Sequence, residues 1–204
     1  MKLPIHTRNA LLVTAKIQSL GVPVEVQQKI GVFAIAWGLF ESHLERAVWG
    51  LKNEEVEGKR PSTDKTFAHN WIEVLGEGSE TIGVKGNEVL SLSAQAAKDL
   101  MSYRHSLFHG YLVPLGGTAV FIRNPQWEGE VRKRETADAQ IDENIIDLAI
   151  DAAWVLFSIV IAVTKIFEDG GPSNIESFES EARRIRRNAN EVRHISKLIN
   201  NEKY

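Results

Sequence analysis

Residues 145–163, IIDLAIDAAWVLFSIVIAV, constrain the fold more than any other part of the chain, because they are apolar almost all the way round a helix. The clearly polar members are Asp147, Asp151 and Ser158. A helix without a polar face is buried in a protein core or spans a membrane. A spanning helix needs about 18 or more apolar residues with few or no charges, and the uninterrupted part, residues 152–163, is shorter. We therefore expect a central core helix, or one with a face against a second subunit, and no membrane association.

Helical periodicity extends over most of the remaining chain. After Gly21-Val22-Pro23, apolar residues recur in steps of four and three, which predicts a long amphipathic helix that ends near Asn53. Its apolar face consists of Val26, Ile30, Phe33, Trp37, Phe40, Leu44, Val48 and Leu51. A polar loop follows, and Thr63 or Asp64 is expected to cap a shorter helix. The inner side of that helix is expected to carry Phe67, Trp71 and Val74.

The next helix is expected to open at Asn87 and to run into the stretch YRHSLFHGY, residues 103–111. His109 is placed at the helix end, and Gly110 just past it, where a left-handed conformation is often required. The periodicity then changes, and YLVPL and TAVFIR on either side of Gly116-Gly117 predict a hairpin. A third strand is expected around residues 131–135.

Two more helices are predicted after the hairpin. The apolar helix is expected to run from about Asp142 and to stop at Gly170-Gly171-Pro172. Asn174 is expected to cap a last helix with one apolar face. This segment is basic, because residues 182–204 contain seven Lys or Arg against two Glu.

Charge and cysteine content limit the classes of partner and compartment. The formal net charge of −3 gives no broad surface for nucleic acid, so any anion site must be local. The compact basic groups are Arg132-Lys133-Arg134 and the run Arg183, Arg184, Arg186 and Arg187, which either contact phosphates or are solvated. The chain has no cysteine, which excludes disulfides and thiolate metal sites and suits a reducing cytosol. Because the first 20 residues also lack the features of a signal peptide, we expect a cytoplasmic protein.

The chemically informative group is Arg104, His105 and His109. On a helix, His105 and His109 share a face, whereas Arg104 and His109 lie about 140° apart. A purely structural explanation is an ion-paired arginine and a histidine that donates to free carbonyls at the helix end. A chemical explanation is that histidine accepts a proton from a 2′-hydroxyl or delivers one to a leaving oxygen, while arginine holds the phosphate. One such histidine leaves one proton-transfer role unfilled unless a symmetric dimer supplies a second copy.

A metal site formed by His105 and His109 is a weaker alternative. Metalloprotease helices with this spacing have a glutamate after the first histidine, and this chain has Ser106 there. No third ligand has a matching position in the sequence. We therefore expect neither a metal nor another cofactor.

Arg104 followed by four residues and His109 resembles the R-x4-H signature of the HEPN superfamily (higher eukaryotes and prokaryotes nucleotide-binding domains). The resemblance covers about residues 24–168. It implies a bundle of four or more helices and dimerisation that brings two signatures together. In many members it implies metal-independent endoribonuclease activity in toxin–antitoxin, abortive-infection and other defence systems.

Three further positions are similar to those of the family. His105 fills the place of a polar residue that commonly follows the arginine, and Glu41, in WGLFESHLE, resembles a glutamate of the early helix that faces the site. Gly110-Tyr111 completes the longer form R-x4-H-x-Y, in which a partner nucleotidyltransferase modifies the tyrosine.

These observations predict a mainly α protein. We expect a HEPN-like up-and-down helical bundle over residues 1–170, with a small β-hairpin insertion at about 111–135 after the motif helix, and an extra C-terminal amphipathic basic helix over 171–204. The expected function is RNA cleavage by 2′-hydroxyl attack in a homodimer that forms through the motif region, restrained by an antitoxin or a nucleotidyltransferase partner. The alternative is a non-catalytic HEPN-like interaction module or a module that binds RNA or nucleotide. The expected roles are catalytic for Arg104 and His109, substrate-binding or orienting for His105 and Glu41, and modification for Tyr111.

Overall fold

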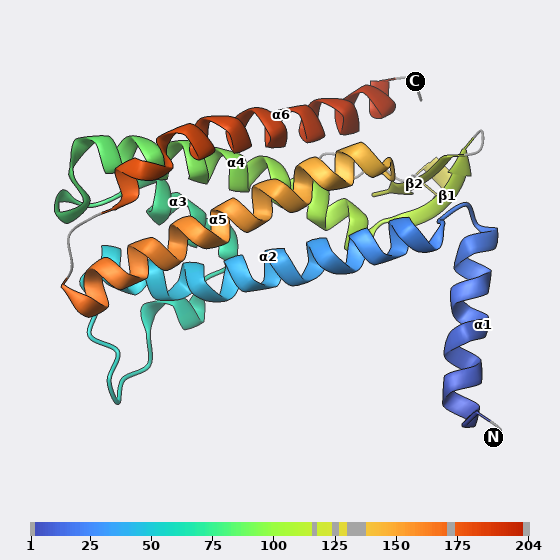
Figure 1. Cartoon of the computed structure of the whole chain (residues 1–204), viewed down its shortest axis with the longest axis horizontal. Helices are drawn as coiled ribbons and strands as arrows, with labels where there is room; N and C mark the ends of the chain where they lie inside the picture. Colours follow the sequence, from blue (N-terminus) through green and yellow to red (C-terminus); the bar gives the residue numbers. More distant parts are fainter. Residues whose placement is uncertain (1–2, 116–117, 124–126, 130–137, 171–173, 202–204) are drawn as a thin grey trace.

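The computed structural model describes residues 3–115, 118–123, 127–129, 138–170 and 174–201 (Figure 1). The structure is mainly helical and has one small antiparallel sheet with strand order β1-β2-β3, as the sequence predicts. The helices are α1 (Ile5–Ser19), α2 (Val24–Leu51), α3 (Ala68–Glu77), α4 (Gly83–His109), α5 (Glu143–Asp169) and α6 (Glu179–Asn201). The strands are β1 (Tyr111–Leu115), β2 (Thr118–Ile122) and β3 (Asp138–Gln140).

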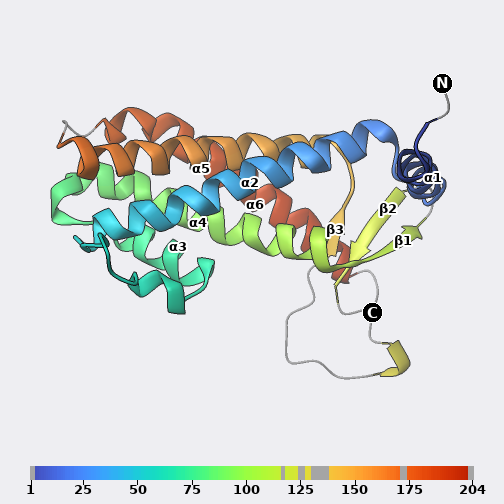
Figure 2. The same cartoon turned by 90° about the horizontal axis from the view of Figure 1, so that it is seen from below.

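The long helices α2, α4, α5 and α6 run alternately in opposite directions along one axis (Figure 1). Their order in space differs from their order in the chain. Helix α5 packs between α2 and α6, and α6 packs along α4. Helix α3 lies against α4 and α2 toward one end of the bundle, whereas the sheet lies at the other end (Figure 2). Helix α1 projects from the sheet end and has no buried residue (Figure 1).

Helix α5 forms the centre of the core. Leu156, Ile159 and Val163 are fully buried in a cluster that contains apolar residues of α2, α4 and α6. By length and composition α5 could cross a membrane, but half of its most apolar window is buried inside the protein. This burial agrees with the prediction of a core helix and is compatible with a soluble protein. Each fully buried Leu or Ile side chain contributes about 1.5–3 kcal/mol of transfer free energy.

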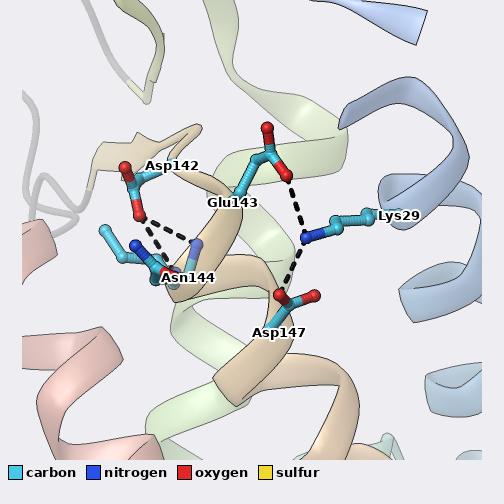
Figure 3. A network of polar contacts seen from close by, with 6 residues as sticks. Lys29, Asp142, Glu143, Asn144 and Asp147 are labelled. Atoms are coloured by element: carbon cyan, nitrogen blue, oxygen red, sulfur yellow. Dashed lines mark hydrogen bonds and ion pairs between the residues drawn. The ribbon is translucent and has the colours of Figure 1, made fainter. Parts of the chain in front are cut away.

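Polar contacts fix the start of α5 (Figure 3). The Asp142 carboxylate accepts hydrogen bonds from the backbone N–H groups of Asn144, at 2.9 Å, and Ile145, at 3.4 Å. Lys29 of α2 donates to Glu143 at 3.1 Å and to Asp147 at 2.8 Å. At the other end, Gly170 is left-handed with φ 60°. Both predicted ends of this helix are therefore confirmed.

Helix α6 is fixed to the bundle by its apolar face and by arginines. Its residues Ala182, Ile185, Ala189 and Val192 are fully buried in the same core as α5. Asp99 of α4, 6% exposed, forms ion pairs with Arg186 and with Arg193, the latter at 3.2 Å. Arg184 pairs with Asp151 of α5. Part of the basic run in this helix therefore serves packing.

The short helix α3 differs from its prediction. It begins at Ala68, and Phe67 precedes it with an extended backbone and a 73% exposed side chain. The buried residues of α3 are Ile72 and Leu75. The prediction of Phe67 on the inner side was wrong because the helix starts one residue after it, so the apolar face follows a different phase.

Two predicted boundaries are also displaced. Helix α4 begins at Gly83 instead of Asn87, and a short 3₁₀ helix, Ile175–Phe178, precedes α6, so Asn174 makes no side-chain cap. The predicted hairpin is present as β1 and β2, and β2 also pairs with β3. The predicted third strand at 131–135 lies outside the described residues.

Replacing Asp99 with alanine is expected to lower the free energy of unfolding by about 2–4 kcal/mol, because Arg186 and Arg193 then lose the buried carboxylate with which both form ion pairs. The measurement is urea unfolding followed by circular dichroism. Glu179→Ala is the control: its pair with Arg183 is exposed on both sides, so its loss costs about 0–1 kcal/mol. Equal effects of the two changes would contradict the anchoring role of Asp99.

Two glycines of α2 are expected to respond oppositely to alanine. At Gly50, a Cβ atom would lie 2.5 Å from the Phe167 ring, so overpacking is expected to destabilise the fold by about 1–3 kcal/mol. At Gly38, no heavy atom lies within 4 Å of the added Cβ in the described structure, so the better helix propensity of alanine is expected to stabilise by up to about 1 kcal/mol. Thermal unfolding of both variants checks the two signs; a stabilised Gly50→Ala would refute the close packing of α2 on α5.

Candidate functional site

The signature segment, residues 104–109, occupies the last two turns of α4. His109 is the last helical residue, as predicted. Gly110 then turns the chain into β1 with φ −81° and ψ 161°, which is an extended conformation. The prediction of a left-handed Gly110 was therefore wrong.

Close packing explains the glycine instead. A Cβ atom on Gly110 would lie 2.3 Å from the Ser106 carbonyl oxygen and 3.0 Å from the Phe121 Cβ atom. The Gly110 N–H donates to that Ser106 carbonyl at 2.8 Å. The end of α4 and strand β2 thus meet at a position that only glycine fills without displacement, which fixes the hairpin against the signature segment.

Arg104 lies at the seam between α4 and α2. Its Nη2 atom is 3.8 Å from Oε2 of Glu41, and both side chains are about one quarter exposed, at 26% and 27%. The guanidinium also lies 5.7 Å from the centre of the Phe108 ring, which stacks on Phe33 of α2 at 6.3 Å. The Nε atom of Arg104 is buried and has no hydrogen-bond partner among the described residues. The structure therefore brings Glu41 and Arg104 together and leaves Arg104 donor capacity unused.

His105 and His109 lie side by side on the outward face of α4. Their ring centroids are 5.8 Å apart, and His109 is exposed whereas His105 is half-buried. The pKa of His105 is lowered to about 4, mainly by burial and in addition by the neighbouring charges of Arg104, Arg123 and His109. His105 is therefore a neutral imidazole at pH 7 that can donate or accept a hydrogen bond.

Arg123 is a site residue that the sequence analysis did not select. It follows β2, whose last residue, Ile122, pairs with Tyr111, the first residue of β1. This register brings Arg123 back beside the end of α4, where its charge acts on His105. From the sequence, only the pairing of Tyr111 with Ile122 in the predicted hairpin could have indicated that Arg123 lies beside the end of α4.

Tyr111 begins β1 and is 53% exposed. A modifying enzyme could reach a side chain with this exposure, so the structure permits the predicted modification without testing it. The hairpin also keeps Tyr111 two residues from His109 on the same surface of the chain end.

The candidates form two groups within a single chain. Arg104 and Glu41 face the α2–α4 seam. His105 and His109 lie side by side on α4, and Arg123 lies beside the end of this helix. Among the described residues, no hydrogen bond or ion pair joins Arg104 to His109. In the part of the chain that the structure describes, no group of three or more His, Cys, Asp or Glu could hold a metal ion.

A separate apolar hollow of about 470 Å³ lies between α5 and the start of α6. Its lining includes Trp154, Phe157, Ile161 and Phe178. None of the candidate residues lines it. It is therefore a surface feature of the α5 side, distinct from the end of α4.

Comparison with known proteins gave no relative for this chain. No model of a known protein family matches it, and neither the curated proteins nor the solved structures include a significant match.

The unusual acidity of His105 predicts a measurable pH dependence. We expect NMR titration of the imidazole, assigned from its loss in His105→Gln, to give a midpoint near pH 4. Because an unfolded histidine titrates near 6.5, the unfolded chain binds more protons between these two values. The stabilisation from the neutral side chain is complete above about pH 6.5 and decreases as the pH falls toward 4.

His105→Gln is expected to remove this component of the acid sensitivity in unfolding experiments at pH 7, 6, 5 and 4. A midpoint at 6.5 or above for the wild-type imidazole would show that burial and the three neighbouring cations do not act on His105.

Proposed function

We propose that the protein is a HEPN-type endoribonuclease of the cytoplasm that acts as a homodimer and belongs to a defence or toxin–antitoxin system. The observation that carries the proposal is the placement of Arg104, His105 and His109 in the last two turns of α4, beside Glu41 of α2. The resemblance of this segment to the R-x4-H signature, in an up-and-down helical bundle, supports the same conclusion.

The chemistry needs a base, an acid and a group that stabilises charge on the phosphate. In the proposed reaction, His109 removes the proton of an RNA 2′-hydroxyl, and the 2′-oxygen forms a bond to the adjacent phosphorus. The bond between phosphorus and the 5′-oxygen breaks, and a second imidazole donates a proton to that oxygen. The products are a 2′,3′-cyclic phosphate and a 5′-hydroxyl end. Arg104 stabilises the negative charge on the non-bridging oxygens.

The homodimer supplies the second proton-transfer group. His105 has a pKa of about 4, so at neutral pH it lacks the proton that a general acid must donate. It suits the role of orienting the substrate. His109 is exposed at the end of the bundle, so the same residue of a second copy can face the same RNA across a two-fold axis.

Glu41 is proposed to keep Arg104 aligned in the absence of RNA. An anionic phosphate competes with a carboxylate for the same guanidinium, and the 3.8 Å separation of the Arg104 and Glu41 atoms is longer than a charge-assisted hydrogen bond of about 2.7–2.9 Å. The pair therefore leaves the guanidinium available to a better acceptor. An antitoxin or a nucleotidyltransferase that modifies Tyr111 would restrain the enzyme at the same chain end.

The second candidate function is a non-catalytic HEPN-like module that binds RNA, nucleotide or a protein. One observation favours it: Arg104 already contacts Glu41 and Phe108 within its own chain, and these contacts suit a structural role. The two functions differ in whether removal of His109 abolishes a reaction.

We expect purified wild-type protein to cleave a labelled mixed RNA in the presence of EDTA, and His109→Ala to lose about 10²–10⁴-fold of the rate, as for loss of a general acid or base. The products are analysed for cyclic-phosphate ends. His69→Ala is the matched control, because His69 is exposed on α3, and it is expected to cleave at the wild-type rate.

Folding and dimerisation of all three proteins are checked by circular dichroism and light scattering. Equal background cleavage by the wild type and His109→Ala, across several RNAs, would contradict the endoribonuclease and support the binding module.

A further inference from the structure

Arg123 is held next to the histidines by the packing of the hairpin. Phe121, two residues earlier, packs against both apolar clusters of the core, and its backbone carbon would lie 3.2 Å from a Cβ atom on Gly110. Because alternate residues of a strand share a face, Arg123 continues the face of β2 that meets the end of α4. The backbone position of Arg123 beside the end of α4 is therefore set by packing on the core.

Arg123, His105 and His109 lie together at the end of α4, and none of them has a carboxylate partner among the described residues. By contrast, Arg46, Arg184 and Arg186 each pair with an acidic side chain. No hydrogen bond or ion pair of Arg123 occurs within the described part of the chain, and Glu41 faces Arg104 instead. Arg123 therefore places a positive charge without a counter-charge next to the half-buried imidazole of His105.

An anion bound beside Arg123 would balance this charge. The chain has a net charge of −3, so this local attraction does not follow from the overall field. Arginine presents a planar fork of donors that matches two oxygens of a phosphate, and neutral His105 can donate one ring N–H to a third. The group lies at the same end of α4 as Arg104, so one RNA strand can contact both.

We infer that Arg123, together with His105 and His109, binds an RNA backbone phosphate adjacent to the phosphate that Arg104 holds. The identity of the anion as RNA rests on the proposed function. Contacts to phosphate position a nucleic acid without reading its bases, so Arg123 contributes affinity and register for any RNA sequence. Through this contact the hairpin becomes part of the substrate-binding surface.

The test measures binding without cleavage. The probe is a fluorescent single-stranded RNA of twelve nucleotides in which every 2′-hydroxyl is methylated, so that 2′-hydroxyl attack cannot occur, and binding is followed by fluorescence anisotropy. Arg123→Gln is expected to weaken binding about tenfold, in line with the loss of a charge-assisted contact. The slope of log K against log salt should decrease by about 0.7, the value for one phosphate of a single strand.

Two variants serve as controls. Arg123→Lys keeps the charge and is expected to weaken binding by about two- to threefold, because only the planar fork is lost. Lys85→Gln makes the same change of net charge in the first turns of α4, at the opposite end of this helix, and is expected to leave affinity and salt slope unchanged. Near-UV circular dichroism confirms that each variant keeps its packing.

The imidazole of His105 gives an independent readout. Arg123→Gln removes one of the cations next to it, so the pKa of His105 in the free protein is expected to rise. Addition of the RNA to wild-type protein is also expected to raise it, because a bound phosphate favours the charged imidazole. In Arg123→Gln this RNA-dependent rise is expected to be smaller, whereas a purely structural role of Arg123 would leave it unchanged.

The outcomes separate this inference from the proposed function. Unchanged affinity and salt slope in Arg123→Gln, with normal cleavage of unmodified RNA, would overturn the phosphate contact and leave the endoribonuclease intact. Weakened binding in Arg123→Gln, without cleavage by the wild type, would support the contact and overturn the endoribonuclease. Failure of the wild-type protein to bind the probe would overturn the phosphate contact, whereas the endoribonuclease is decided by the cleavage of unmodified RNA.

Discussion

The burial of α5 determines the arrangement of the other helices. Its apolar surface extends round most of its circumference, so it must be covered on more than one side, and α2 and α6 provide that cover. Helix α4 then packs along α6 and faces α2 across a wider seam, which large aromatic side chains fill. Phe33 contacts both Tyr103 and Phe108 there. At this seam Glu41 of α2 lies opposite Arg104 of α4. The candidate site therefore depends on how the other helices pack around α5.

The same arrangement gives the hairpin its role. Helix α4 ends and helix α5 begins at the same end of the bundle, so the connection between them, which contains the sheet, lies at that end (Figure 2). The sheet packs through Phe121 on the core. The signature segment ends where this connection begins, at Gly110. Residues of the connection therefore lie beside the last turn of α4.

The long helices could be predicted from the sequence because their apolar spacing is regular over many turns. The predicted helix from Pro23 to about Asn53 is α2, and the predicted ends of α5 agree with its caps. Predictions for short elements were wrong at two places. At Phe67 the helix begins one residue later than the prediction requires, and at Gly110 the need for glycine comes from a tertiary contact. Of the candidate site, Arg104, His105 and His109 could be selected from a local pattern. Arg123 could be reached only through the register of the predicted hairpin, and the packing of β2 that holds it beside α4 is a tertiary contact that no local pattern encodes.

The pairing of distant segments has a consequence for synthesis of the protein. Lys29 meets Asp147, 118 residues later, and Asp99 meets Arg186, 87 residues later. Long-range contacts of this kind form late in folding, because a large loop must close first. During translation α2 and α4 emerge with their apolar faces uncovered, and α4 is clamped only when α6 has left the ribosome. The charged end of α4 thus takes its final position only after α6 has been made, which separates synthesis of the signature segment in time from any activity of the site.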